Sequence, residues 1–460
     1  MAAVLWFRRD LRLSDHPALL AARDAAEASA GVDSPGVVGL FVLDETLRRP
    51  SGPARLAFLY RCLRDLDSQL DGRLVVRRGD PVNVVAAVAR EAGAQTVHVS
   101  ADYGPYGAER DRRVEAALAD DGRELVRTGS PYAVAPGRVR RADGSPYRVF
   151  TPYSRAWRDA GWRPPATRPR EVPWLALHGI GIPQDPRLGT TELLPAGEEA
   201  ARDRLTAFLR SVDGYRDGRD LPAAEATSRL SPYLKYGCIH PRTILQKLPN
   251  TAGAKTFMNE LAWREFYADV LWHQPRSARA DLTDALAGLD YADEKRGQGA
   301  QHFEAWKQGK TGYPIVDAGM RQLLAEGWMH NRVRMIVASF LVKDLHIWWR
   351  PGARWFLERL VDGDLASNNH GWQWVAGTGT DAAPYFRVFN PVLQGEKFDP
   401  EGEYVRRYVP ELRALEGKAV HSPWAAVGGP PKGYPAPIVD HAAERKETLA
   451  RYEQARSTKR

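Results

Sequence analysis

The chain has 460 residues, a length that allows two domains and a connector between them. Hydrophobic residues make up 43% and charged residues 27% of it, which excludes a disordered chain, and no apolar run reaches the roughly 18 residues that a membrane span needs. The formal net charge of +8 permits a polyanionic partner, and two cysteines are too few for a disulfide framework or an iron–sulfur cluster.

The first 130 residues alternate short β-branched runs with helical stretches. We expect buried strands at Val4–Phe7, Val37–Val42, Leu74–Val76 and Thr96–Val99, and helices at Pro17–Ala28, Ala54–Leu70 and Pro81–Ala92. This alternation predicts a parallel sheet, with ligands beyond the carboxyl ends of the strands. The segment from Trp6 to Arg12 stands where a glycine-rich dinucleotide motif would follow the first strand, and it is either a binding loop or a charged turn. Because the chain becomes charged at Arg8, too early for a signal peptide, we expect a cytoplasmic protein.

The rest of the chain divides into a proline-rich segment and a helical region. Residues 131–200 hold 11 of the 33 prolines, which predicts a long connector over the surface without long helices. The later pattern predicts helices at Glu198–Arg210, Pro241–Leu248, Ala254–His273, Phe303–Lys307, Ile315–Glu326, Asn331–Asp344 and Arg354–Leu360. We therefore expect an α/β domain over 1–130, a linker over 131–200 and an all-α domain over 201–460, whose tail after about 425 is proline-rich and then charged.

Two segments of the helical region combine polar and aromatic side chains at helical spacing. The run from Thr227 to Ser231 places hydroxyls at a helix start, where they either cap the helix or bind phosphate. Glu260, Trp263 and Arg264 fall on one helix face, from which a carboxylate can hydrogen-bond and an indole can stack on a flat ligand. An ion pair between Glu260 and Arg264 is the structural alternative.

Two further segments carry polar residues that a purely structural bundle does not need. One has Asn331, Arg334 and Met335 on a shared helix face, beside His330, which has no second ligand at metal spacing, so we expect no metal site. The other is the polar run Asp362–Trp374, which leads into a Trp-x-Trp sequence and indicates a loop that lines a site.

These segments, in this order, resemble the photolyase/cryptochrome flavoprotein family, most closely the class I cyclobutane pyrimidine dimer photolyases. The likeness extends from Trp6–Arg12 through Trp263–Tyr267 to Asp381–Arg387, over nearly the whole chain. It implies an α/β Rossmann-like antenna domain joined by a long linker to an all-α FAD-binding domain, as the patterns above also predict.

The resemblance implies that FAD lies within the helical domain. Residues matching the family's FAD site are Tyr215, Thr227, Ser228, Arg229, Leu230 and Ser231 around the phosphates and ribityl chain, Asp362, Gly363 and Asp364 beside the ring and ribose, and Asn331 and Arg334, with Arg334 paired to Asp362. Asn368 matches the residue that faces flavin N5. A neutral amide there suits the reduced anion FADH−, because a second negative charge would raise its energy.

The resemblance also implies light-driven repair of DNA that contains cyclobutane pyrimidine dimers. Excited FADH− donates an electron to a flipped-out dimer, the cyclobutane ring opens, and the electron returns. Residues matching the lesion pocket are Trp263 and Trp374 as aromatic walls, Glu260 as the partner of the pyrimidine edge, Asn331 and Met335 as lining, and Arg219 on phosphate. The residues assigned to the reaction are Glu260, Asn368, Trp263, Trp374 and Met335.

Residue choice separates this chain from other branches of the family. Asn331 and Met335 stand where (6–4) photolyases place histidines, and two cysteines cannot supply the four ligands of the iron–sulfur branch. The chain ends about 80 residues after Asp381, without the long signalling extension of plant and animal cryptochromes. A cryptochrome-type blue-light photoreceptor is the alternative function, and a non-catalytic flavin- or DNA-binding protein is a more distant one. We expect a bacterial monomer in the cytoplasm, associated with the nucleoid through DNA.

Many photolyases reduce oxidised flavin through three tryptophans that lead to the surface. Trp372 and Trp349 match the inner and middle members, whereas the outer position, ten residues before Trp306, holds Arg296. A tryptophanyl radical cannot oxidise arginine, so we expect less efficient photoreduction, with Tyr291 as the nearest aromatic substitute.

Two features resemble the deazaflavin-binding branch of the family. They are the run from Asp102 to Gly107 and Lys235. We expect an antenna chromophore and favour 8-hydroxy-5-deazaflavin over methenyltetrahydrofolate. Lys235 either faces this anionic chromophore or is a solvated surface lysine.

Overall fold

The computed structural model describes residues 2–28, 36–382, 387–426 and 428–457. The chain forms two compact units, the first made of Met1–Leu188, Leu194–Asp213 and Ser228–Pro275 and the second of Gly189–Leu193, Gly214–Thr227 and Arg276–Arg460. These units group residues by contact and do not test the domain boundaries at 130 and 200, which stay a prediction. Part of the segment Asp381–Arg387, on which the resemblance draws, lies outside the described residues.

The first unit is built on a five-stranded sheet in the order β3-β2-β1-β4-β5, in which every pairing is parallel. Its strands are β1 (Ala3–Phe7), β2 (Val37–Leu43), β3 (Val75–Arg78), β4 (Thr96–Val99) and β5 (Glu124–Arg127). The central β1 pairs through Leu5 with Gly39 of β2 and with His98 of β4. Strand order reverses between β1 and β4, the point at which open parallel sheets bind ligands. The predicted parallel sheet is confirmed, although β5 was not predicted.

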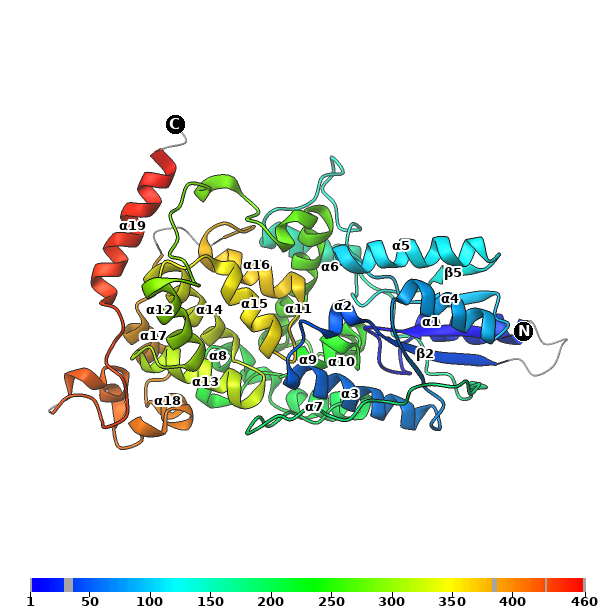
Figure 1. Ribbon diagram of the computed structural model, residues 1–460, viewed down its shortest axis with the longest axis horizontal. Helices are drawn as coiled ribbons and strands as arrows, with labels where there is room; N and C mark the ends of the chain where they lie inside the picture. Colours follow the sequence, from blue (N-terminus) through cyan, green and yellow to red (C-terminus); the bar gives the residue numbers. More distant parts are fainter. Residues whose placement is uncertain (1, 29–35, 383–386, 427, 458–460) are drawn as a thin grey trace. The chain divides into compact units, whose positions relative to one another are not determined.

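Helices cover both faces of this sheet (Figure 1). They are α1 (Pro17–Ala28), α2 (Glu45–Arg48), α3 (Pro53–Gln69), α4 (Pro81–Glu91) and α5 (Pro105–Asp120). Helix α1 contacts β1 and β4, α4 contacts β1 and β2, and α5 contacts β5. Because side chains alternate along a strand, Val4 and Trp6 point to the same face, where they share a core with Val85 of α4 and Leu118 of α5.

The proline-rich connector contributes more than a surface path. It contains α6 (Phe150–Ala160), which buries Tyr153 and Trp157, the latter with 0% of its surface exposed. The helix tolerates its proline because Pro152 lies in the first turn, where the missing N–H has no intrahelical partner. Trp174, farther along, forms a parallel bridge with Val37 at the start of β2. The expectation of a connector confined to the surface was therefore wrong for these parts.

The remaining helices complete the two units. The first unit contains α7 (Glu198–Leu209), α9 (Ser231–Tyr236), α10 (Pro241–Lys247) and α11 (Ala252–His273). The second contains α8 (Tyr215–Gly218), α12 (Gly297–Gln308), α13 (Pro314–Glu326), α14 (Asn331–Ser339), a π-helical turn (Phe340–Asp344), α15 (Trp349–Arg359), α16 (Leu365–Ala376), α17 (Pro391–Phe398), α18 (Glu403–Tyr408) and α19 (His441–Ser457).

The core of the second unit lies among α13, α14, α15 and α16, whose ribbons are shown in Figure 1. It is rich in aromatic side chains. Trp306, Trp349 and Trp372 all belong to it. Among the described residues, none of the helices is both long enough and apolar enough to cross a membrane.

Candidate active site

The predicted lesion-contact face lies on α11 in the first unit. Trp263 is half-buried and stacks on Phe150 of α6, with ring centroids 3.7 Å apart and planes 7° from parallel. Tyr267, one turn later, places its ring 5.3 Å from that of Trp263. Phe150 covers one side of the indole, so a flat ligand must use the other side. No local pattern in the connector pointed to Phe150 as the partner of Trp263.

Arg264, on the same helix, binds the main chain. Its guanidinium donates to the carbonyl oxygens of Pro131 at 3.1 Å and Leu234 at 3.3 Å, and lies 4.6 Å from the ring centroid of Tyr132. Arg264 therefore fastens the connector and α9 to α11, a role that the sequence did not suggest, while its pairing with Glu260 stays a prediction.

Glu265, a buried carboxylate next to Arg264, also fixes the connector to α11. Glu265 accepts hydrogen bonds from the main-chain N–H groups of Ala133 at 2.5 Å and Val134 at 2.9 Å, and from the indole of Trp157 at 2.6 Å. Burial raises the pKa of Glu265, while these donors oppose the shift. The helix that carries Trp263 is thus held by contacts with two parts of the connector, residues 133–134 and α6.

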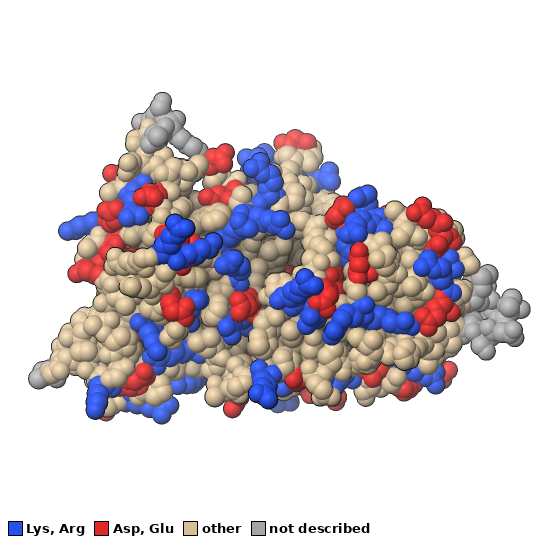
Figure 2. Space-filling model, viewed as in Figure 1, with Lys and Arg blue, Asp and Glu red and all other residues tan. Residues whose placement is uncertain are grey.

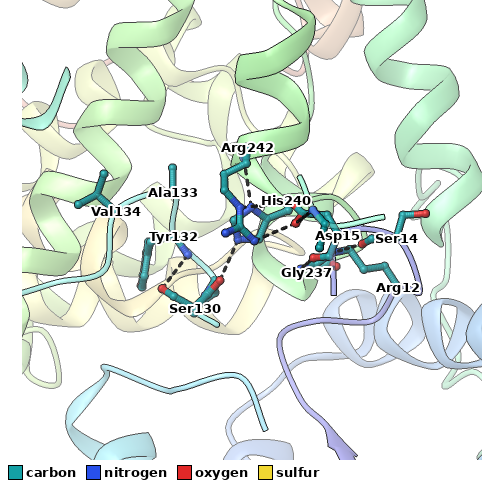
Figure 3. Close-up of polar contacts among 12 residues, drawn as sticks. Arg12, Ser14, Asp15, Ser130, Tyr132, Ala133, Val134, Gly237, His240 and Arg242 are labelled. Carbon is teal, nitrogen blue, oxygen red and sulfur yellow. Dashed lines mark hydrogen bonds and ion pairs between the residues drawn. The ribbon is translucent and has the colours of Figure 1, made fainter. Parts of the chain in front are cut away.

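Figure 3 shows the polar cluster that holds the beginning of the connector. His240 donates from Nε2 to the carbonyl of Ser130 at 2.8 Å and accepts at Nδ1 from the main-chain N–H of Arg242 at 3.1 Å. Arg242 in turn donates to Asp15 at 2.8 Å. Burial, with the charges of Arg12 and Arg242, lowers the pKa of His240, so the ring is neutral in this tautomer. The cluster gives residues 130–134 a fixed path toward Glu265.

The hydroxyl-rich segment makes a local turn before α9. Ser228 accepts at Oγ from the N–H of Leu230 at 3.3 Å, and Arg204 donates to the Ser228 carbonyl at 2.7 Å. Arg229 has a φ of 49°, in the left-handed region that non-glycine residues rarely adopt. Ser231 is exposed as the first residue of α9. The Ser228 hydroxyl therefore orders the turn before α9, whose N-cap residue Leu230 has no side-chain capping hydrogen bond, and phosphate binding stays a prediction.

In the second unit, Tyr215 and Arg219 lie at α8. Tyr215 is buried, and the Arg219 guanidinium carbon lies 5.7 Å from its ring centroid. Arg219 also lies 3.9 Å from Asp220, which Arg332 of α14 meets at 2.9 Å. Thr227 follows in the same unit and is half-buried.

The predicted pairing of Arg334 with Asp362 is confirmed. Arg334 donates to Asp362 Oδ2 at 2.8 Å and, through Nε, to the carbonyl of Met329 at 2.8 Å. The Asp362 side chain is only 2% exposed, so its charge is neutralised where water does not reach it. Gly363 leads to Asp364, which caps α16 by accepting from the N–H of Ser367 at 3.1 Å.

Asn368 has a fixed amide orientation on α16. Its amide nitrogen donates to the carbonyl of Ala353 at 3.0 Å and to Oδ1 of Asn369 at 2.8 Å. An amide has two N–H donors, and both are used here. The side chain therefore offers its carbonyl oxygen, an acceptor, to whatever lies beside it.

The other lesion-pocket residues of this unit lie on α14 and α16. Asn331 is exposed at the first position of α14, and Met335 lies one turn later with its sulfur 3.8 Å from Arg332. Trp374 of α16 is half-buried, and Trp374 and Met335 pack against the same hydrophobic core.

The residues assigned to electron transfer are buried in the second unit. Trp372 contacts Trp306 and Phe356, with ring centroids 6.0 and 5.1 Å apart. Trp349 begins α15, and 0% of its surface is exposed. The Arg296 side chain is 86% exposed at the N-cap of α12, in keeping with a surface position.

The predicted antenna residues lie at the carboxyl edge of the sheet and on α9. Asp102, which follows β4, accepts from the N–H of Gly104 at 3.1 Å and from Arg110 at 3.2 Å. Burial raises the pKa of Asp102, but the charges of Arg110, Arg9 and Arg8 outweigh it and leave the pKa lowered. A Cβ on Gly107 would lie 2.1 Å from Asp102, so the glycine is required for this approach. Lys235 of α9 is half-buried.

Charge is mixed on the visible surface. On the face drawn in Figure 2, Lys and Arg side chains are spread among Asp and Glu side chains. Within the described ranges, no three His, Cys, Asp or Glu side chains lie close enough together to hold a metal ion.

Two family models match the chain. The model for DNA photolyase matches residues 3–171, and the model for the FAD binding domain of DNA photolyase matches residues 257–454. A protein of Streptomyces griseus named deoxyribodipyrimidine photo-lyase is 45% identical over 472 residues, which cover 99% of each chain.

Solved structures of the same kind match over almost the full length. A bacterial class III photolyase from Agrobacterium tumefaciens is 38% identical with a TM-score of 0.89, covering 99% of this chain and 98% of that one. A cryptochrome from Synechocystis sp. is 27% identical with a TM-score of 0.87, covering 98% of each chain.

Proposed function

The chain belongs to the DNA photolyase family, and we propose that it repairs cyclobutane pyrimidine dimers in DNA in a light-driven reaction. The observation that carries the proposal is the 45% identity, over 99% of both chains, to a protein named deoxyribodipyrimidine photo-lyase. The segment that matches the FAD binding domain also holds the buried Arg334–Asp362 pair and the oriented amide of Asn368. The class I subtype stays a prediction.

The donors and acceptors present fit a reduced flavin. Both N–H groups of the Asn368 amide donate to other protein groups, so the side chain presents its neutral carbonyl oxygen. This oxygen can accept a hydrogen bond from a ring N–H without adding charge beside an anion. We propose that FAD is held by Tyr215, Thr227, Ser228, Arg229, Leu230, Ser231, Asn331, Arg334, Asp362, Gly363, Asp364 and Asn368. The Arg334–Asp362 pair supports this set, because a carboxylate neutralised in a buried position can accept hydrogen bonds from a ring without repelling it.

Bound FAD, once reduced and excited by light, supplies the electron that opens the cyclobutane ring and takes it back afterwards. The protein's part is to bind and orient the flipped-out dimer and to keep water away. Trp263, backed by Phe150, offers one stacking surface, and Trp374 offers another. Glu260 hydrogen-bonds the pyrimidine edge and holds a proton near the negative charge that develops there, Met335 and Asn331 shape the pocket, and Arg219 binds phosphate.

Repair of a defined substrate tests this function. Purified holoprotein, chemically reduced beforehand, should restore an oligonucleotide with one thymine dimer under near-UV or blue light, and should leave it unchanged in the dark. Repair in the dark, or no repair by fully reduced holoprotein in the light, would overturn the proposal.

The likeness to a cryptochrome supports a blue-light photoreceptor as the second candidate. A sensor without repair activity binds dimer-containing and undamaged DNA alike and shows no light-dependent turnover. A preference for damaged DNA together with turnover decides for the enzyme.

Three further properties belong to the same proposal. Asp102 and Lys235 hold an antenna chromophore in the first unit, because Asp102 lies beside the strand-order reversal where such sheets bind ligands. The resemblance of the run Asp102–Gly107 and of Lys235 to the deazaflavin-binding branch favours 8-hydroxy-5-deazaflavin over methenyltetrahydrofolate. Absorption and fluorescence spectra of the chromophores released on denaturation identify the bound molecule. The protein acts as a monomer, which light scattering of the purified protein tests. It acts in the cytoplasm, which cell fractionation tests.

A further inference from the structure

Two adjacent tryptophans of the second unit share one carboxylate. The ring centroids of Trp348 and Trp349 are 5.8 Å apart. Both indole N–H groups donate to Oδ1 of Asp281, at 3.3 Å from Trp348 and 2.6 Å from Trp349. Trp348 is the N-cap of α15 with a φ of −54° and a ψ of 144°, so the helical spacing does not turn its side chain away from Trp349.

The two tryptophans differ in their exposure to solvent. Trp349 is fully buried, whereas Trp348 is half-buried and so reaches solvent. On α15, Gly352 lies one turn after Trp349 on the same face, and a Cβ there would lie 2.3 Å from the ring of Trp372. The face of α15 that carries Trp349 is therefore packed against Trp372.

We propose that Trp348 is the surface outlet of the electron relay, and that it replaces the outer tryptophan missing at Arg296. The inference rests on the proposed function, because it takes FAD as the acceptor beside Trp372. One electron moves at each step: Trp372 is oxidised as it gives an electron to photoexcited oxidised flavin, Trp349 reduces Trp372, and Trp348 reduces Trp349. Oxidised Trp348 loses its Nε1 proton to Asp281. A thiol in solution then returns one electron and becomes a thiyl radical, Asp281 returns the proton to Trp348, and the thiol's own proton goes to water.

Proton loss to Asp281, rather than fixed charge, gives the transfer its direction. The carboxylate of Asp281 stabilises a positive charge on either indole, because it lies within hydrogen-bond distance of both. The guanidinium carbon of Arg350 lies 5.7 Å from the Trp348 ring centroid and disfavours a cation on that ring. Proton loss to Asp281 removes this repulsion and keeps the oxidised site at the surface, where a reductant can reach it.

Two other routes are less suited to the task. Trp306 contacts Trp372, but it is fully buried, and its stacking neighbours Phe303 and Phe356 have phenyl rings that a tryptophanyl radical cannot oxidise. Tyr291, the substitute suggested by the sequence, must release its phenolic proton when it is oxidised. Burial, with the nearby Tyr452 and Asp281 charges, raises the pKa of Tyr291 and opposes that release.

Photoreduction of the oxidised holoprotein tests the outlet. Trp348→Phe should reduce its flavin under blue light with dithiothreitol as slowly as Trp349→Phe, and transient absorption should show loss of the long-lived neutral tryptophan radical. Trp355→Phe is the matched control, because Trp355 is a half-buried tryptophan of α15 that packs instead under Arg359, at 4.3 Å. This control should photoreduce at the wild-type rate. Flavin absorbance per protein checks that each variant is loaded.

Asp281→Asn tests the proton step. It should leave a tryptophan radical that absorbs as the cation rather than as the neutral species, and that returns to the ground state sooner.

The inference is overturned if Trp348→Phe keeps the wild-type photoreduction rate and radical lifetime. If Tyr291→Phe slows flavin photoreduction and Trp348→Phe does not, Tyr291 is the outlet. Repair by chemically reduced wild-type protein reports on the proposed function alone, so the two failures are distinguishable.

Discussion

The stack of Trp263 on Phe150 makes a quantitative prediction about lesion recognition. If Trp263 stacks on a flipped-out base, Trp263→Ala should weaken binding of dimer-containing DNA by roughly 1–3 kcal/mol. Phe150 fixes the indole plane from behind, at 3.7 Å and 7°. If ordering the freed indole on binding costs as much as the aromatic pair energy of about 0.5–1.5 kcal/mol, removal of Phe150 should raise Kd by about 2- to 12-fold.

The measurement is fluorescence anisotropy titration of a labelled duplex with and without one thymine dimer, at a fixed salt concentration. Phe150→Ala should weaken binding of the damaged duplex and leave undamaged-DNA affinity nearly unchanged. Tyr147→Ala is the matched control, since Tyr147 is a half-buried aromatic of the same connector that contacts Tyr153. It should leave both affinities unchanged.

The double variant of Phe150 and Trp263 separates positioning from general destabilisation. Phe150 acts through Trp263, so the double variant should lose no more lesion affinity than Trp263→Ala alone. Additive losses, or equal losses on damaged and undamaged DNA, would refute the reasoning and return the two rings to a core role.

Three other predictions concern the remaining lesion contacts. Trp374→Ala should weaken binding of the damaged duplex by roughly 1–3 kcal/mol in the same titration and spare undamaged DNA; an equal loss on both would make it a core residue. Glu260→Ala should lower the repair yield per absorbed photon more than the lesion affinity, because the carboxyl group acts chiefly on the charged intermediate; an unchanged yield would leave Glu260 with a structural role. The logarithm of the DNA-binding constant should fall by about 0.9 per decade of salt for each phosphate contacted, and a flat dependence in titrations at several salt concentrations would contradict phosphate contacts.

The elements predicted well are those whose local pattern agrees with their tertiary setting. The helix Pro17–Ala28 begins with a proline suited to the first turn and has the predicted bounds. Strand β5 escaped notice because charged residues flank Leu125 and Val126, its two apolar positions. Helix α19 escaped because it is highly charged, so composition alone suggested a solvated tail.

The site was predictable as a set of residues but not as a set of contacts. Residues close in sequence, such as Glu260 and Trp263 one turn apart, are placed on one face by helical geometry alone. The backing of Trp263 by Phe150 joins residues more than one hundred positions apart, and helical periodicity carries no information on such a pair. The same limit applies to Asp281, whose partners Trp348 and Trp349 lie in another helix-forming segment.

An assignment based on spacing in the sequence is also wrong where function depends on which side chains lie close together in the fold. Arg296 occupies the counted position of an outer relay residue, and taken alone it predicts an interrupted path. Electron transfer needs closely spaced rings and a route to solvent. Trp348 meets both conditions, because its ring centroid lies 5.8 Å from that of Trp349 and its side chain is half-buried. Neighbouring residues inside a helix point about 100° apart, so the doublet did not suggest that the two rings meet edge to face. Trp348 lies at the N-cap of α15, where the backbone is not helical and this constraint does not apply. Both indole N–H groups can therefore donate to Asp281. A helix boundary, which is the least certain feature of a sequence-based assignment, thus determines whether the relay is complete.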